Sequence, residues 1–179
     1  QIINYSLLHL VDGLRTPLCK VCQITGVLCP SCEEKLEKGE VSNLDVRVSV
    51  FLGRKTRNLK ELNDVYLLKT ETVDNLLILL FRKGDSSRFT KYGRDVLKEL
   101  EEEFKMDVVA LDYHPNLKQF IEEVFHPIPV ATINVIWLPD GSKETRILLQ
   151  RRVRGRKVEL ARKIIRKIKN VEVKVESIS

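Results

Sequence analysis

Residues 151–169 read "RRVRGRKVELARKIIRKIK", and this stretch predicts a long amphipathic helix that begins near Gly155. It contains ten Lys or Arg residues but one acidic residue, Glu159. Because ordinary surface helices pair acids with bases at i,i+4, this imbalance favours contact with a polyanion over a merely solvated face. The aliphatic residues recur at helical spacing and form one stripe that would face a core: Val158, Ala161, Ile164, Ile165 and Ile168.

A second glycine, Gly93, precedes another amphipathic helix pattern 62 residues before Gly155, in "FTKYGRDVLKEL" (residues 89–100). The elements expected around the two glycines follow the same order of helix, strand, strand, helix, strand. A supersecondary order that repeats at a fixed offset indicates two copies of one small α+β unit. The expected helices lie at 43–62, 93–104, 116–125 and 155–168, and the expected strands at 65–70, 75–81, 108–111, 131–138, 146–150 and 171–175.

The charge of the chain is distributed unevenly over three expected segments. Residues 1–42 contain all four cysteines and carry a net charge of −1. The first copy, residues 43–112, is neutral, with 13 basic and 13 acidic residues. The second copy, residues 113–179, carries 14 basic and 7 acidic residues, a net charge of +7. Concentration of positive charge on one part of a chain is expected for a nucleic-acid-binding face.

The four cysteines form two C-x2-C pairs separated by six residues, in "LCKVCQITGVLCPSC" (residues 18–32). Two residues between thiolates let each pair turn in a tight knuckle, and two knuckles complete a tetrahedral S4 site. Thr25 and Gly26 lie between the pairs and suit the turn of a small hairpin. The sequence therefore predicts one structural zinc ion, with four ligands: Cys19, Cys22, Cys29 and Cys32.

Other roles for the cysteines are less consistent with their spacing. Disulfides are disfavoured in a cytosolic protein, and a redox C-x2-C needs a single motif on a βαβ background. An iron–sulfur cluster is a chemically possible alternative. A closed S4 site has no position for substrate, and the three histidines lack nearby catalytic partners in the sequence. We therefore expect no enzyme activity and no small-molecule substrate.

Each copy places a basic, glycine-containing loop before an amphipathic helix. Glycine permits close approach of the backbone, and the N–H groups and dipole of a helix N-terminus favour phosphate oxygens. The KH module uses this arrangement, in which a GXXG loop clamps the backbone of a single strand. The candidate RNA-binding residues are Lys91, Tyr92, Gly93 and Arg94 in the first copy, and Arg151, Arg152, Arg154, Gly155, Arg156, Lys157 and Arg162 in the second.

Two stretches, "KGDSSRFTKYGRDVLKELEEEF" (83–104) and "GRKVELARKI" (155–164), resemble the KH repeats of archaeal NusA-like proteins. The resemblance covers about residues 43–179, and the cysteine segment is similar to the zinc-binding extension of some archaeal KH proteins. It implies an α+β chain in which a zinc knuckle or ribbon precedes two type II KH-like units. It also implies binding of single-stranded RNA and a role with the transcription machinery.

The loops depart from the family pattern at one position each. Thr90 stands where the first loop would have its first glycine, and Arg152 stands there in the second. The second copy also leaves almost no room after Gln150 for the short helix that normally precedes the loop. We therefore expect binding dominated by cations and phosphates, with little discrimination between bases.

Two aromatic residues allow more than one interpretation. Tyr92 could stack on a base or cover the core. Trp137 lies in an apolar strand, before the turn "PDGS" (139–142), and is expected in the core.

Three functions are consistent with the sequence. The first is an RNA-binding elongation or termination factor that works with RNA polymerase. The second is a structural RNA-binding protein of the ribosome or another ribonucleoprotein. The third is a protein-interaction adaptor whose KH folds no longer bind RNA. No apolar run approaches the ~20 residues of a membrane span, so we expect no membrane partner and a cytoplasmic location.

Overall fold

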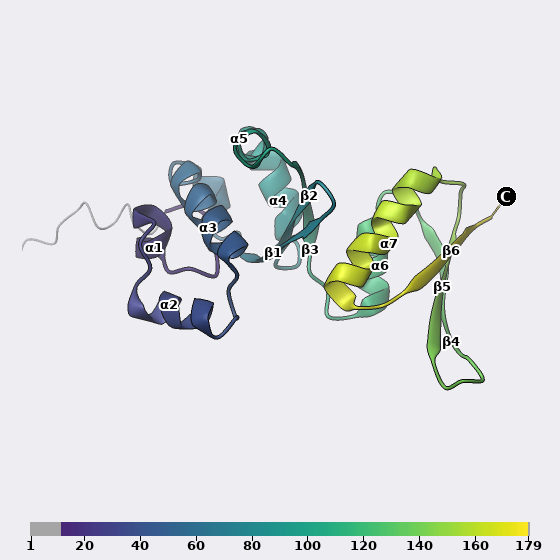
Figure 1. The fold of residues 1–179 in the computed structure, drawn as a ribbon. Coiled ribbons are helices and arrows are strands. Elements are labelled where there is room, and N and C mark those ends of the chain that lie inside the picture. The colour runs from purple at the N-terminus through teal and green to yellow at the C-terminus, as the bar shows by residue number, and fades with distance from the viewer. Residues whose placement is uncertain (1–11, 179) are drawn as a thin grey trace, which may run out of the picture. The chain divides into compact units, whose positions relative to one another are not determined.

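The structure, a computed structural model, describes residues 12–178 and divides into two compact units (Figure 1). Unit 1 is Gln1–Tyr113 and unit 2 is His114–Ser179. The cysteine segment belongs to unit 1, because its first helix packs against the long helix that follows it.

Unit 1 contains one three-stranded sheet. Some of its helices precede the sheet in the chain, and two others lie between the second and third strands. The strand order is β1-β2-β3, with β1 and β2 antiparallel and β2 and β3 parallel. The central strand, β2, is almost entirely buried, which explains its unbroken apolar sequence. In chain order the elements are α1 (Lys20–Thr25), α2 (Pro30–Glu37), α3 (Asn43–Lys55), the 3-10 helix η2 (Lys60–Leu62), β1 (Leu67–Val73), β2 (Leu76–Phe81), α4 (Asp85–Tyr92), α5 (Arg94–Phe104) and β3 (Asp107–Asp112).

The start of α3 is fixed by a capping box. The Ser42 hydroxyl accepts from the Asp45 N–H at 3.0 Å, and the Asp45 carboxylate accepts from the Ser42 N–H at 2.9 Å. The second Asp45 oxygen accepts from both the N–H and the hydroxyl of Thr70, at 2.7 and 2.6 Å. The expected N-cap at Ser42 is therefore confirmed. The same Asp45 carboxylate also ties α3 to β1.

The cysteine segment packs closely on α3 at a mid-helix glycine. A Cβ on Gly53 would lie 2.6 Å from the Cβ of Gln23 in α1, so a larger residue would push the two helices apart. The amide of Gln23 donates to the Leu18 carbonyl at 2.9 Å, and Arg54 donates to the Ile24 carbonyl at 2.9 Å. Glycine lowers helix propensity, and here it allows α1 to dock.

Unit 2 has the same strand arrangement. Its sheet order is β4-β5-β6, with the first pair antiparallel and the second parallel. Residues of α6 and α7 pack on one face of this sheet, where Phe120, Ile165 and Ile147 are buried. The elements are α6 (Leu117–Phe125), β4 (Val130–Trp137), β5 (Lys143–Leu149), α7 (Gly155–Lys169) and β6 (Val173–Ser177).

The mixed α+β class predicted from the sequence is confirmed, and the expected order of helices and strands recurs in both units. Within residues 43–112, unit 1 contains one α-helix that the sequence did not predict, α4, between β2 and α5. In unit 2 the described residues between Leu149 and Gly155 form no such helix, as expected from the short connection.

Three local predictions were wrong. The pairs of cysteines lie at the starts of two helices, α1 and α2, so there is no hairpin at Thr25 and Gly26 among the described residues. Thr90, expected in a loop, lies inside α4, where its hydroxyl donates to the Ser86 carbonyl four residues earlier at 2.9 Å. Trp137, expected in the core, is 67% exposed.

Candidate metal centre and candidate nucleic-acid interface

The four cysteines come together because each pair spans the first turn of a helix. Cys19 and Cys29 are the N-cap residues of α1 and α2, and Cys22 and Cys32 lie three residues further on. All four Sγ atoms lie within 4.8 Å of one another. A tetrahedral site with metal–sulfur bonds of 2.3 Å would place its sulfur atoms about 3.8 Å apart. The cluster therefore has the donor atoms and the size to hold a metal ion.

Backbone N–H groups point at the sulfur atoms. The N–H of Cys29 donates to Cys22 Sγ at 3.1 Å, and the N–H of Cys19 donates to Cys32 Sγ at 3.4 Å. Cys32 N–H donates to Cys29 Sγ at 3.5 Å. These donors favour thiolates, the form of cysteine that binds metals. The segment folds so that the backbone of one cysteine pair supports the sulfur atoms of the other.

The environment of the thiols differs between the buried and exposed sides of the cluster. Burial raises the pKa of the Cys22 thiol to about 12 and also raises the pKa of Cys32. The hydrogen bond from the Cys32 N–H lowers the pKa of Cys29 to about 7. The protein alone therefore stabilises one thiolate and opposes the buried ones, so a bound cation would supply the missing positive charge.

In unit 2 the predicted basic residues surround the start of α7. All five cations nearest Gly155 are exposed, and none forms an ion pair with another described residue. They are Arg151, Arg152, Arg154, Arg156 and Lys157. The first turn of α7 contains no acidic residue, and a Cβ on Gly155 would have nothing within 4 Å. The structure thus places a dense group of cations on open surface.

Arg162 has a different role from the other candidate residues of unit 2. It is half-buried, its Nε donates to the Val173 carbonyl at 3.0 Å, and its Nη1 pairs with Glu159 at 3.1 Å. It therefore joins α7 to β6 and neutralises the charge of Glu159, the one acidic residue of the helix.

The candidate residues of unit 1 lie at the corner between α4 and α5. Lys91 and Tyr92 end α4, and Lys91 Nζ lies 5.1 Å from the Tyr92 ring centroid. Gly93 is buried, and a Cβ there would lie 2.8 Å from the Phe89 carbonyl oxygen. Arg94 is exposed and begins α5. Gly93 is thus required for the packing of this corner.

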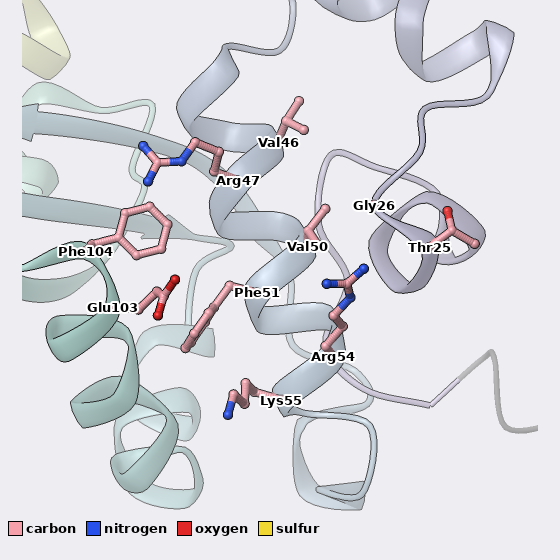
Figure 2. A pocket seen from close by; sticks show the side chains of 10 residues that line it. All are labelled: Thr25, Gly26, Val46, Arg47, Val50, Phe51, Arg54, Lys55, Glu103 and Phe104. Atoms are coloured by element: carbon pink, nitrogen blue, oxygen red, sulfur yellow. The ribbon is translucent and has the colours of Figure 1, made fainter.

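Unit 1 also has a groove of about 640 Å³ lined by α3, α5 and the end of α1, which the sequence did not reveal (Figure 2). Phe51 and Phe104 meet edge to face with their ring centroids 6.2 Å apart, and Arg47 lies 4.7 Å from the Phe104 centroid. The α3 wall is basic, through Arg47, Arg54 and Lys55, whereas α5 contributes Glu103. The lining of the groove therefore carries a net positive charge.

A scan against protein-family models finds no match to the chain, and a search of curated proteins finds none either. The solved structures that are similar to it include one described as "Crystal structure of APE1850", with 24% sequence identity and a TM-score of 0.49. The alignment covers 58% of this chain and 79% of that chain. In the part of the chain that the structure describes, no helix is both long and apolar enough to span a bilayer.

Proposed function

We propose that this protein binds single-stranded RNA through unit 2, with the cations at the start of α7 holding the phosphates. The observation that supports this proposal is the group of five exposed cations at 151–157, none of which is paired with another described residue. Mutual repulsion of such a group is relieved when a polyanion binds and its counterions are released. Arginine suits this role because its planar guanidinium can bind a phosphate through two parallel hydrogen bonds.

The proposal extends to tandem KH-like units of the archaeal NusA-like kind, acting in transcription elongation or termination. The shared strand order and the shared mix of antiparallel and parallel pairing support two copies of one unit. The resemblance of residues 83–104 and 155–164 supplies the link to transcription. The second candidate is a ribonucleoprotein component that binds folded RNA, and the loss of the first loop glycine at Thr90 and Arg152 favours it.

We further propose that the cysteine cluster binds one zinc ion. Four sulfur donors at the spacing found here match the structural sites that zinc prefers. When bound, the ion would hold α1 and α2 together. The role is structural, because four protein ligands leave no coordination position for substrate.

The test of RNA binding is a charge reversal with a matched control. Arg152, Arg154 and Arg156 are changed to Glu in one variant, and Lys91, Arg94 and Lys98 in the other, so both lose the same net charge. Binding to labelled single strands is measured by fluorescence anisotropy. The unit 2 variant should lose about a hundredfold or more in affinity, whereas the unit 1 variant should lose much less.

A salt titration defines the mode of binding. Five phosphate contacts predict a slope of roughly −3 to −4 in log K against log salt for a single strand. Unrelated sequences should bind within about tenfold of one another. A larger loss in the unit 1 variant, or a shallow slope with strong preference for one sequence, contradicts the proposal. Tighter binding to a folded RNA than to any single strand selects the ribonucleoprotein role.

A further inference from the structure

Trp137 occupies an unusual position for the largest apolar residue of the chain. It ends β4 with 67% of its surface exposed, and Val135, two residues earlier on the same face, is 48% exposed. Apolar side chains on one face of a strand are normally buried against a second layer. The exposure therefore needs a structural explanation.

The pairing of β4 with β5 shows where this face lies. Val135 pairs with Thr145 and Trp137 pairs with Lys143. Residues that pair directly have their side chains on the same face of a sheet. Thr145 is only 3% exposed, so Val135 and Trp137 continue the face that the helices cover further along the sheet.

The hairpin extends beyond the rest of unit 2 at this end. β6 begins at Val173, opposite Thr145, so the Trp137–Lys143 pair has no third strand beside it. Figure 1 shows the β4–β5 hairpin running past the ends of α6 and α7. The indole is exposed because the hairpin extends beyond the helices that cover the rest of this face.

The turn holds this end of the hairpin in place. The Leu138 N–H donates to the Ser142 carbonyl at 2.8 Å, and the Gly141 N–H donates to the Leu138 carbonyl at 2.9 Å. Asp140 accepts from the Ser142 N–H at 2.9 Å. Because these bonds fix the turn, little further ordering is needed when a ligand contacts the indole.

A cation accompanies the exposed ring. Lys143 Nζ lies 4.5 Å from the Trp137 ring centroid. The pair therefore combines an aromatic surface with a positive charge, as in sites that bind single strands by stacking on bases and attracting phosphates. An anionic partner with flat apolar groups fits this chemistry. A second copy of the chain fits less well, because two exposed apolar residues offer far less surface than the ~800 Å² that each partner buries in a stable dimer.

We propose that Trp137 is a base-stacking platform for the single strand bound by unit 2. The inference rests on the proposed RNA binding and adds a second contact to it. β5 spans about 20 Å between Lys143 and Leu149, just before the cations at 151–157. The RNA strand would thus be held through its phosphates by the cations at one end of the sheet, and through a stacked base by Trp137 at the other. This contact uses the face of a base, so it adds affinity without reading sequence.

Trp137 is the one tryptophan of the chain, so its fluorescence reports on this position alone. The probes are a single-stranded RNA of about 12 nucleotides and an abasic strand of the same length and charge. The base-containing strand should quench the emission, and the abasic strand should leave it nearly unchanged. Trp137→Ala should weaken binding of the base-containing strand roughly fivefold or more, and binding of the abasic strand much less.

Two further variants separate stacking from other effects of the substitution. Trp137→Phe keeps an aromatic face and should retain most of the affinity. Tyr113→Ala removes an aromatic residue that is 36% exposed and belongs neither to the candidate RNA-binding residues nor to β4, and it should leave affinity unchanged. Equal loss in the Ala and Phe variants would overturn the stacking role.

The outcomes distinguish this inference from the proposed function. Salt-dependent binding of both strands with no change in tryptophan emission overturns the platform and leaves the phosphate site intact. Absence of salt-dependent binding to any strand overturns both proposals. A concentration-dependent change in emission without RNA would show a second copy of the chain on this surface, and would also overturn the platform.

Discussion

The two units keep a glycine at matching places, but the glycines have different surroundings. Gly93 lies in the corner between α4 and α5, where a Cβ would come within 2.8 Å of the Phe89 carbonyl oxygen and 3.2 Å of its ring. Gly155 starts α7 with open space around it and follows the strand β5 through a short connection. The first is fixed by packing, whereas nothing within the described fold requires the second.

This difference separates two reasons for a glycine before a helix. Where the chain itself fills the space, as at Gly93, the glycine indicates a close approach of helices. At Gly155 the space is open and the surrounding cations pair with no other described residue, which is consistent with the proposed ligand. Similar local sequences can therefore form a structural corner in one copy and the proposed binding surface in the other.

Removing the proposed metal ligands should give the largest difference between the two units. Cys22→Ser with Cys32→Ser should eliminate a stabilisation on the order of 10 kcal/mol and unfold α1 and α2. RNA affinity should stay within about twofold, because the cysteines and the cations belong to separate compact units and share no partner residues. Hydrogen exchange in α1 and α7, together with anisotropy, measures both effects.

The native protein should contain about one zinc per chain when its metal content is measured. Four free thiols without metal, or the visible absorbance of an iron–sulfur cluster, would contradict this.

An alanine at each glycine tests the comparison directly. Gly93→Ala should lower the free energy of unfolding by about 1–3 kcal/mol, because the new methyl group overpacks against the backbone of Phe89. Gly155→Ala should be neutral or stabilising by less than about 1 kcal/mol, since it adds a better helix former in open space. Urea unfolding of both variants gives the values. Equal losses at the two positions would remove the distinction between corner and surface.

The smallest effect is expected from placing in unit 2 the first loop glycine of the KH pattern, to which residues 83–104 and 155–164 bear a resemblance. Arg152→Gly removes one exposed cation and should weaken RNA binding by roughly threefold to fivefold, while reducing the salt slope by about 0.7. Thr90→Gly is the matched change in unit 1 and should leave affinity unaltered. A gain in affinity for Arg152→Gly would show that the loop holds RNA through its backbone, as in a GXXG clamp.

Much of the fold follows from local patterns in the sequence. The apolar spacing of α5, α6 and α7 predicted those helices to within a few residues, and the capping residues Ser42 and Asp45 predicted the start of α3. The C-x2-C spacing predicted that four sulfur atoms would converge. Each of these signals lies within one turn or one face, so it does not depend on the rest of the chain.

The wrong predictions involve tertiary structure or short segments. α4 has one deeply buried apolar side chain, Phe89, so its sequence carried little periodic signal. The exposure of Trp137 depends on how far the hairpin extends past the helices, and no pattern within β4 encodes that length. The groove beside Phe51 needs α3 and α5 to be placed together, which a linear sequence does not show.

The compact spacing of the cysteines also bears on the order of synthesis. All four ligands lie within 14 residues and precede α3 in the chain. Loop closure over so short a segment costs little entropy, and domains made at the ribosome fold from their amino-terminal side. The proposed metal site needs no residue of either sheet, so it can form while the strands are still being translated. Packing of α1 against Gly53 must wait until α3 has emerged, so the proposed metal centre would assemble before the part of the fold that it contacts.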